Sequence, residues 1–247
     1  MKKIALTLEN INKSFISPEG VSSPVIKNIS VSIADGEFFV FVGPSGSGKS
    51  TLLRIMSGLD SAYTGTCTYG EHIKKSDISF VFQNFALLPW MTVEENIAIG
   101  LVARNIPKDK QKEIVNRELK RFGLKKFAQL KPRALSGGMK QRVGFARALA
   151  TDPKILFLDE AFSELDSFIA RELHIELLKI WSESNITVVM VTHIIDEAVE
   201  LADRVAIVSS RPATIKKLLP IKLKRPRERR EPAFFDYADK IYEILRP

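Results

Sequence analysis

Residues 38–51 are FFVFVGPSGSGKST. The stretch opens with an apolar run, residues 38–42, whose aromatic and β-branched side chains are typical of a strand buried on both faces of a parallel sheet. The residues that follow match the phosphate-loop pattern G-x-x-x-x-G-K-[ST] at every fixed position. We therefore expect a strand, a loop and a helix in succession, with the helix beginning near Lys49.

This loop has the chemistry of an anion site. Its glycines let several backbone N–H groups point into one concavity, and the helix adds its positive N-terminal end. In such loops the lysine, here Lys49, reaches the β- and γ-phosphates, and the hydroxyl of Ser50 binds Mg²⁺. The stretch predicts a site for a nucleoside triphosphate. Its residues are Gly43, Pro44, Ser45, Gly46, Ser47, Gly48, Lys49, Ser50 and Thr51.

The composition is that of an ordinary globular chain. Of 247 residues, 45% are hydrophobic and 27% charged, which predicts one domain or one domain with a lobe. The lone cysteine, Cys67, excludes an internal disulfide and fits a reducing compartment. The first apolar stretch is interrupted at Thr7 and Glu9, too early for a signal peptide, so we expect a cytosolic location. A net charge of +8 permits nucleic acid or an anionic membrane surface as partner without choosing between them.

The hydrophobic pattern predicts an α/β fold. Residues 4–9 and 29–33 alternate between apolar and polar side chains and, with residues 65–69, suggest a small antiparallel sheet; residues 12–24 are expected to form a loop. Apolar strands at 78–82, 155–158 and 186–191 alternate with helices at 137–150 and 169–181, the pattern of a parallel sheet.

Between these segments the chain becomes helical. Thr92 and Glu95 form a capping-box pattern. Residues 108–122 carry apolar side chains on one helical face and end at Gly123. We therefore predict a helical insert at about 88–149.

Polar residues that follow the strands are candidates for chemistry. Asp159 closes an apolar strand, as the magnesium-ordering carboxylate of phosphate-loop enzymes does, and Glu160 follows it. Because side chains alternate on a strand, one carboxylate can face the metal while the other activates water as a general base. Gln83 and His193 also end strands, where Gln83 could contact Mg²⁺ or its water and His193 the γ-phosphate.

A second glycine-rich helix start lies at residues 135–141, LSGGMKQ. A serine cap before two glycines is an anion site, and a chain with one phosphate loop needs only one. One interpretation is that this helix completes the site of another copy, so that two ATP molecules lie between head-to-tail protomers. The alternative is ordinary helix capping.

Taken in order, the motifs GPSGSGKST, Gln83, LSGGMKQR, ILFLDE, SELD and His193 resemble those of the ATP-binding subunit of an ABC transporter, over nearly the whole chain. The resemblance implies ATP hydrolysis, with Glu160 and His193 catalytic and Ser50, Gln83 and Asp159 at Mg²⁺. It implies that Phe15 stacks on adenine. It also implies that residues of one copy contact the ATP of the other, namely Ser136, Gly137, Gly138, Gln141 and Asp166.

The same resemblance implies the architecture. The expected fold is an α/β phosphate-loop NTPase (RecA-like) with a parallel-sheet core, an antiparallel β subdomain and a helical subdomain insert. The single domain, residues 1–247, divides into core and β subdomain at about 1–87 and 150–220, the helical insert, and a basic tail with a C-terminal helix at about 221–247. Three positions depart from the family pattern, which more often has tyrosine at Phe15, proline at Ala161 and a small residue at Glu164.

Residues 86–96 (ALLPWMTVEEN) and the ending around residues 209–227 are similar to the nitrate, sulfonate and taurine import branch. This similarity implies a homodimer on the cytoplasmic face of the cell membrane, bound peripherally to integral membrane permease subunits and served by a separate solute-binding protein. No nucleic acid partner is expected.

Two other functions remain open. A soluble ABC ATPase acting on nucleic acid or ribosomes would suit the +8 charge, but such proteins usually carry two cassettes or a long coiled-coil insert. A generic phosphate-loop kinase is disfavoured by the LSGGMKQ motif.

Overall fold

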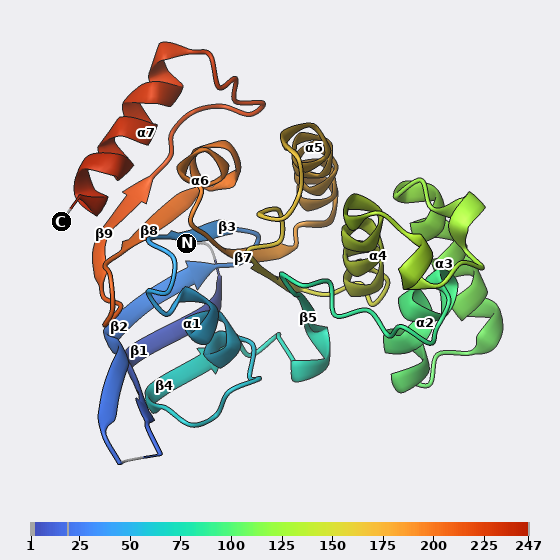
Figure 1. Cartoon of the computed structure of the whole chain (residues 1–247), viewed down its shortest axis with the longest axis horizontal. Helices are drawn as coiled ribbons and strands as arrows, with labels where there is room; N and C mark the ends of the chain where they lie inside the picture. The colour runs from blue at the N-terminus through green and yellow to red at the C-terminus, as the bar shows by residue number, and fades with distance from the viewer. Residues whose placement is uncertain (1–2, 19, 247) are drawn as a thin grey trace.

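Helix α1 (Lys49–Met56) packs between two sheets in a computed structural model that describes residues 3–18 and 20–246 (Figure 1). Its apolar side chains, which include Leu52 and Leu53, form one buried cluster with residues of both sheets. The helix follows the phosphate loop directly, so this packing fixes the loop against the core.

The larger sheet has the strand order β5-β6-β7-β3-β8-β9 and is parallel except for β9. Its strands are β3 (Phe38–Val42), β5 (Ile78–Val81), β6 (Ile155–Asp159), β7 (Thr187–Thr192), β8 (Arg204–Val208) and β9 (Ile215–Pro220).

The inner parallel strands β3, β6 and β7 are buried on both faces, as the sequence predicted for residues 38–42, whereas the edge strand β5 is only partly buried. Phe39 and Phe41 point to the side of α1, whereas Phe38 and Val40 belong to the cluster on the opposite face. That face is covered by α5 (Ser167–Ser184), α6 (Ile195–Leu201) and α7 (Pro232–Leu245) (Figure 1). A continuous apolar run is what a strand with two covered faces requires.

The smaller sheet is antiparallel, with the order β2-β1-β4. Its strands are β1 (Ile4–Ile16), β2 (Ser22–Ala34) and β4 (Thr64–Tyr69). The loop predicted at residues 12–24 is too long, because β1 continues to Ile16 and β2 begins at Ser22. Asn10 and Asn28 take left-handed backbone angles at irregularities in the pairing, and Asn28 N donates to Asn12 Oδ1 at 2.9 Å. Bulges thus absorb residues that otherwise favour loops.

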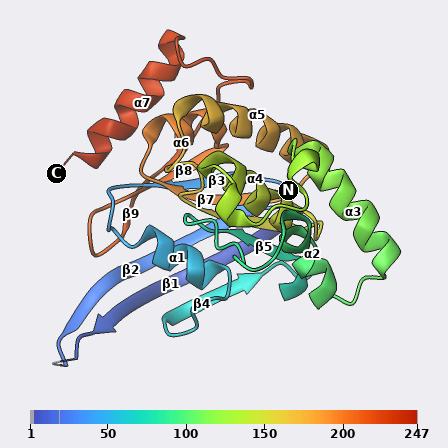
Figure 2. The same ribbon diagram turned by 45° about the vertical axis from the view of Figure 1, so that its right-hand side comes forward.

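Three helices gather at one end of the molecule, beyond β5: α2 (Val93–Ala103), α3 (Lys108–Arg121) and α4 (Gly137–Leu149) (Figures 1 and 2). Helix α4 contacts α2, α3 and β5. The predicted helices at 108–122 and 137–150 are confirmed to within one residue at each end. Short 3₁₀ turns lie at Lys75–Asp77, Lys125–Phe127 and Pro132–Ala134. The predicted subdomain boundaries stay a prediction.

Among the helices of the described part of the chain, none combines the length and apolar character that crossing a bilayer requires.

The entry into α2 is held by a confirmed capping box and a buried asparagine. Thr92 N donates to Glu95 Oε2 at 2.7 Å, and Glu95 N donates to Thr92 Oγ1 at 3.3 Å. Asn96 is fully buried; its Oδ1 accepts from Leu88 N at 2.8 Å, and its Nδ2 donates to three carbonyls, those of Leu88, Met91 and Thr92. One side chain therefore fixes the loop of residues 88–92.

We expect Asn96→Ala to lower the free energy of unfolding by about 1–3 kcal/mol, because it leaves buried backbone groups without partners. Urea titration followed by circular dichroism measures this. The exposed helical asparagine Asn116 offers the matched control, and Asn116→Ala should change stability by less than about 0.5 kcal/mol. Equal effects of the two substitutions would contradict the role of Asn96.

Candidate functional site

The candidate site lies where three adjacent parallel strands end. β6, β7 and β3 are neighbours in the sheet, and the phosphate loop follows β3, Glu160 follows β6 and His193 follows β7. Because parallel strands present their carboxyl ends at one edge, residues distant in sequence meet there.

The phosphate loop is curled by its glycines. Gly46 and Gly48 have φ angles of 73° and 110°, in the region that favours glycine. A Cβ on Gly48 would lie 2.8 Å from Val25 Cγ1. This close approach leaves no space for any side chain at the start of α1. The Ser47 hydroxyl is buried in this loop without a hydrogen-bond partner among the described residues.

Lys49 is buried at the centre of the site. Its Nζ donates to the carbonyls of Gly43 at 2.9 Å and Pro44 at 2.8 Å, and lies 3.9 Å from Glu160 Oε1. Burial lowers the pKa of Lys49, while the carboxylates of Glu160 and Asp159 oppose that shift. The Lys49 ammonium is thus held in a position where an anion could replace the two carbonyl oxygens as its partner.

Ser50 and Asp159 form the second contact. Ser50 Oγ donates to Asp159 Oδ1 at 2.6 Å. Burial raises the pKa of Asp159, and the hydrogen bond from Ser50 opposes the rise. A hydroxyl and a carboxylate side by side are oxygen ligands of the kind that Mg²⁺ prefers, together with phosphate oxygens and water. The residues present therefore fit this ion.

Glu160 pairs with His193 across the ends of β6 and β7. Glu160 Oε2 lies 2.9 Å from His193 Nδ1. The Glu160 backbone has φ 44°, and it is held by Glu160 N donating to Val191 O at 3.1 Å and by Ser163 Oγ donating to Glu160 O at 2.9 Å. A strained residue kept by such contacts is typical of functional positions. Its carboxylate lies between Lys49 and His193.

A cavity of about 200 Å³ opens on these groups. It brings predicted residues together with two that sequence analysis missed, Val25 and Arg211. Arg211 Nε donates to Pro24 O at 3.3 Å, and Phe15 is 48% exposed. No local motif marks Val25 or Arg211, because the antiparallel sheet and the chain after β8 bring them here. The lining residues are Phe15, Val25, Gly46, Gly48, Lys49, Ser50, Thr51, Glu160 and Arg211.

Gln83 lies outside this lining. It is exposed and follows β5 at the edge of the sheet, beside β6. Arg147 of α4 holds its segment by donating to Phe85 O at 2.9 Å and Ala86 O at 2.6 Å. The predicted metal contact of Gln83 stays a prediction.

The second glycine-rich helix start has the expected cap. Ser136 Oγ accepts from Met139 N at 3.3 Å. Ser136 and Gly137 are exposed, whereas Gly138 is buried, and a Cβ there would meet Ile169 at 3.0 Å. The helix capping is confirmed, and Ser136 and Gly137 are exposed at the start of the helix.

Gln141 of the same helix is fully buried, and its Nε2 donates to Ala161 O at 2.5 Å, so it connects α4 to the segment after Glu160. Its predicted contact with the ATP of a second copy stays a prediction. Asp166 is exposed and caps α5, accepting from Phe168 N at 3.1 Å and Ile169 N at 3.0 Å.

Comparison with known proteins identifies the family. The model of the ABC transporter family matches residues 26–163. The nitrate import ATP-binding protein NrtD of Synechocystis sp. is 42% identical over 253 residues, which cover 98% of this chain and 95% of that protein. The aliphatic sulfonates import ATP-binding protein SsuB of Bacillus subtilis is 45% identical over 234 residues, which cover 94% and 90%.

A solved structure agrees with these relatives. The dimeric structure of the ATP-binding cassette MJ0796 in a post-hydrolysis state, bound to ADP and Pi, has a TM-score of 0.79 and 31% sequence identity. It covers 89% of this chain and 100% of that one. The phosphate loop, the carboxylate-bearing strand end and the family match lead to one conclusion: this chain belongs to the ABC transporter family.

Proposed function

We propose that this chain hydrolyses ATP to drive the import of a small solute through separate membrane subunits. One observation carries the ATPase assignment: the Glu160 carboxylate lies between Lys49 Nζ, 3.9 Å from Oε1, and His193 Nδ1, 2.9 Å from Oε2. A carboxylate between a phosphate-binding cation and a histidine is suited to activate water beside a γ-phosphate.

The phosphate loop supplies the binding energy for the triphosphate. Lys49 Nζ exchanges its contacts with the Gly43 and Pro44 carbonyls for the β- and γ-phosphates. The buried Ser47 hydroxyl adds a donor, and Phe15 offers an exposed ring to adenine beside the loop.

The Ser50–Asp159 pair would hold Mg²⁺, with Gln83 at the neighbouring strand end as a further ligand. When bound there, the ion would supply positive charge to the phosphate oxygens. Glu160 takes the proton of the attacking water, and His193 keeps the Glu160 carboxylate in place through the 2.9 Å contact.

Two copies share each site. The N-terminal end of α4, where Ser136 and Gly137 are exposed, faces the γ-phosphate bound by another copy and offers it the positive end of the helix. ATP then favours the closed dimer by mass action, because only that state uses both anion sites. Loss of the γ-phosphate removes the anion that bridges the chains, and the dimer reopens.

We expect Glu160→Gln to lower ATP turnover by roughly 10²- to 10⁴-fold, because it removes the base and keeps the size of the side chain. The variant should accumulate as an ATP-bound dimer, which sedimentation velocity with Mg²⁺ and ATP measures. Adding Lys49→Ala or Ser136→Arg to it should return the protein to monomer, since each removes one half of the shared site.

The exposed glutamate Glu183, at the end of α5, offers a matched control. Glu183→Gln should leave both turnover and sedimentation unchanged. Turnover near wild type in Glu160→Gln would remove the general-base assignment, and a monomer at high ATP would contradict the shared site.

The membrane subunits dock beside the Gln83 segment. The loop of residues 88–92, held by Asn96, presents Trp90 with 65% of its surface exposed. Arg147 holds the Gln83 segment to α4. Pro89 and Trp90 are both exposed on this loop, and we propose that a short helix of a permease subunit binds them.

Cysteine cross-linking tests this docking. In a Cys67→Ser background, which removes the lone native thiol, Trp90→Cys should cross-link to cysteines introduced into cytoplasmic loops of the permease. Arg230→Cys, in the exposed basic tail, is the control. Cross-links from position 230 alone would contradict the proposed surface.

The solute is proposed to be a small anion of the nitrate, sulfonate or taurine type. The named relatives import nitrate and aliphatic sulfonates, whereas the nucleic-acid alternative finds no support among them. Three of the chain's arginines, Arg204, Arg225 and Arg227, are engaged internally, which weakens the charge argument for nucleic acid.

Growth of a deletion strain tests the solute class. We expect a defect on nitrate as sole nitrogen source, or on sulfonates or taurine as sole sulfur source, that wild-type protein restores and Glu160→Gln does not. Normal growth on all three would count against this branch.

A further inference from the structure

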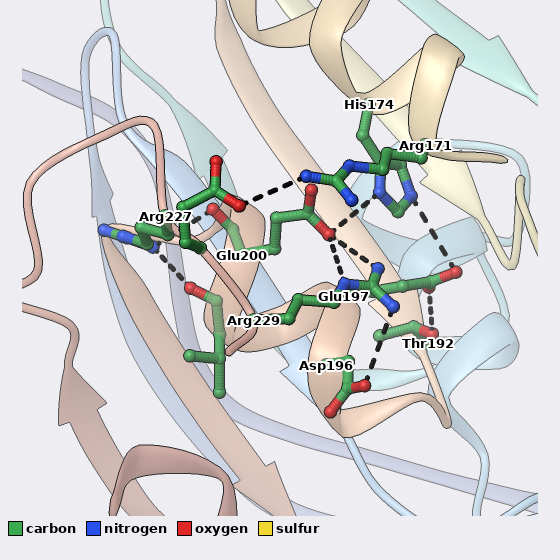
Figure 3. Close-up of polar contacts among 10 residues, drawn as sticks. Arg171, His174, Thr192, Asp196, Glu197, Glu200, Arg227 and Arg229 are labelled. Carbon is green, nitrogen blue, oxygen red and sulfur yellow. Dashed lines mark hydrogen bonds and ion pairs between the residues drawn. The ribbon is translucent and has the colours of Figure 1, made fainter. Parts of the chain in front are cut away.

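The basic, proline-broken segment of residues 222–231 runs beside α6 (Figure 1). Arg227 and Arg229 bond inward to that helix (Figure 3), and Arg225 donates to Leu201 O at its end. Such a run of charge is usually solvated. The direction of these side chains calls for a different explanation.

Arg227 caps the C-terminal end of α6. Only 6% of its surface is exposed, and its Nη1 donates to Val199 O at 2.6 Å and Ala202 O at 2.7 Å. The last carbonyls of a helix lack partners within the helix, so a guanidinium there stabilises the helix end.

Arg229 bridges two turns of the same helix. Its Nε and Nη2 donate to Glu200 Oε2 at 3.0 and 2.6 Å, and its Nη1 lies 3.6 Å from Asp196 Oδ2 in the first turn. Because α6 extends only from Ile195 to Leu201, this one side chain spans most of the helix (Figure 3).

Behind Glu200 lies a buried histidine of α5. His174 Nδ1 is 3.3 Å from Glu200 Oε2, and His174 Nε2 is 3.9 Å from Glu197 Oε1 (Figure 3). Burial would raise the pKa of Glu200, but the hydrogen bonds and charges of His174 and Arg229 hold it below its usual value. Burial raises the pKa of Glu197. The carboxylates therefore depend on their partners to stay in place.

Glu197 connects this cluster to the catalytic edge. Its Oε2 accepts from Thr192 Oγ1 at 2.6 Å, and Thr192 Oγ1 accepts from Ile194 N at 3.0 Å. Thr192 and Ile194 flank His193, which pairs with Glu160. A chain of contacts thus runs from Arg229 through Glu200 and His174 to Glu197, in which the 3.9 Å approach of His174 to Glu197 is an ionic contact and not a hydrogen bond. Thr192 continues the chain to the loop that carries His193, which contacts Glu160.

We propose that residues 222–231 are a clamp that positions His193: Arg227 and Arg229 fix α6, and Glu197 and Thr192 hold the adjoining loop that carries the histidine. The inference rests on the role proposed for His193. The described lining of the phosphate-loop cavity includes no residue of the clamp, so loosening the clamp affects turnover and spares ATP binding.

The kinetic test compares two neighbouring arginines. Arg229→Gln should lower kcat about 3- to 10-fold with an unchanged KM for ATP, in full-length protein assembled with its permease partners. Arg229→Lys should recover part of the rate, because an ammonium still reaches Glu200. Arg230→Gln removes the same charge from an exposed side chain and should retain wild-type kinetics.

A spectroscopic test detects His193 itself. The chain has 3 histidines, His72, His174 and His193. Selective ¹⁵N labelling of histidine therefore gives the NMR resonances of three imidazoles. Spectra of His193→Gln and His72→Gln assign them, because each variant lacks the resonances of one ring. Arg229→Gln should shift the resonances of His174 and His193 and leave that of His72 in place. Arg230→Gln should shift none.

Three results overturn the clamp: a His193 resonance unmoved in Arg229→Gln, a raised KM in place of a lowered kcat, or equal losses in Arg229→Gln and Arg230→Gln. The single variant His193→Gln separates the two proposals. Wild-type turnover there removes the role of His193 and the clamp with it. Lost turnover there, with Arg229→Gln normal in kinetics and resonances, overturns only the clamp.

Discussion

The parallel order of β6, β7 and β3 is the constraint on which the rest of the structure depends. It brings the phosphate loop, Glu160 and His193 to one edge, although they come from separate parts of the sequence. The register of these strands is fixed because alternate side chains enter different cores: Phe39 faces α1, and Phe38 faces α5 and α6. A slip of one residue would exchange the two faces and move every side chain of the site.

This edge of the larger sheet holds several groups whose burial or backbone conformation costs folding free energy. Lys49 is buried, which lowers its pKa, and Asp159 is buried, which raises its pKa. Glu160 adopts a left-handed backbone that costs of order 1–3 kcal/mol. Each group is held by its neighbours: the Gly43 carbonyl contacts Lys49, and Ser50 contacts Asp159. The apolar cores on both faces of the sheet offset these costs.

Short sequence motifs were sufficient to predict much of the fold and of the candidate site. The strand at 38–42, the phosphate loop, the cap at Ser136 and the capping box at Thr92 depend on short spacings, which the sequence displays directly. The placement of Arg211 and the His174–Glu200–Arg229 cluster depend on how distant segments pack, and no local pattern encodes that. The strand through residues 12–16 was missed because the serine, proline and glycine content of residues 12–24 suggested a loop, although pairing with β2 keeps β1 extended to Ile16. The burial of Gln141 was missed because a motif does not reveal which way a side chain points.

Two sets of contacts tie the site to different helices. On one side, Arg147 joins the Gln83 segment to α4, and Gln141 of the same helix bonds to Ala161, directly after Glu160. On the other side, Thr192 and Glu197 join the His193 loop to α6. Glu160 and His193 meet between these two supports, so their 2.9 Å contact depends on how α4 and α6 sit against the sheet. A rotation of either helix would change that distance first, because both helices contact residues adjoining the pair, whereas Lys49 and Ser50 belong to α1 in the core. The geometry therefore separates the phosphate loop, which is anchored in the core, from the Glu160–His193 pair, whose placement depends on the outer helices.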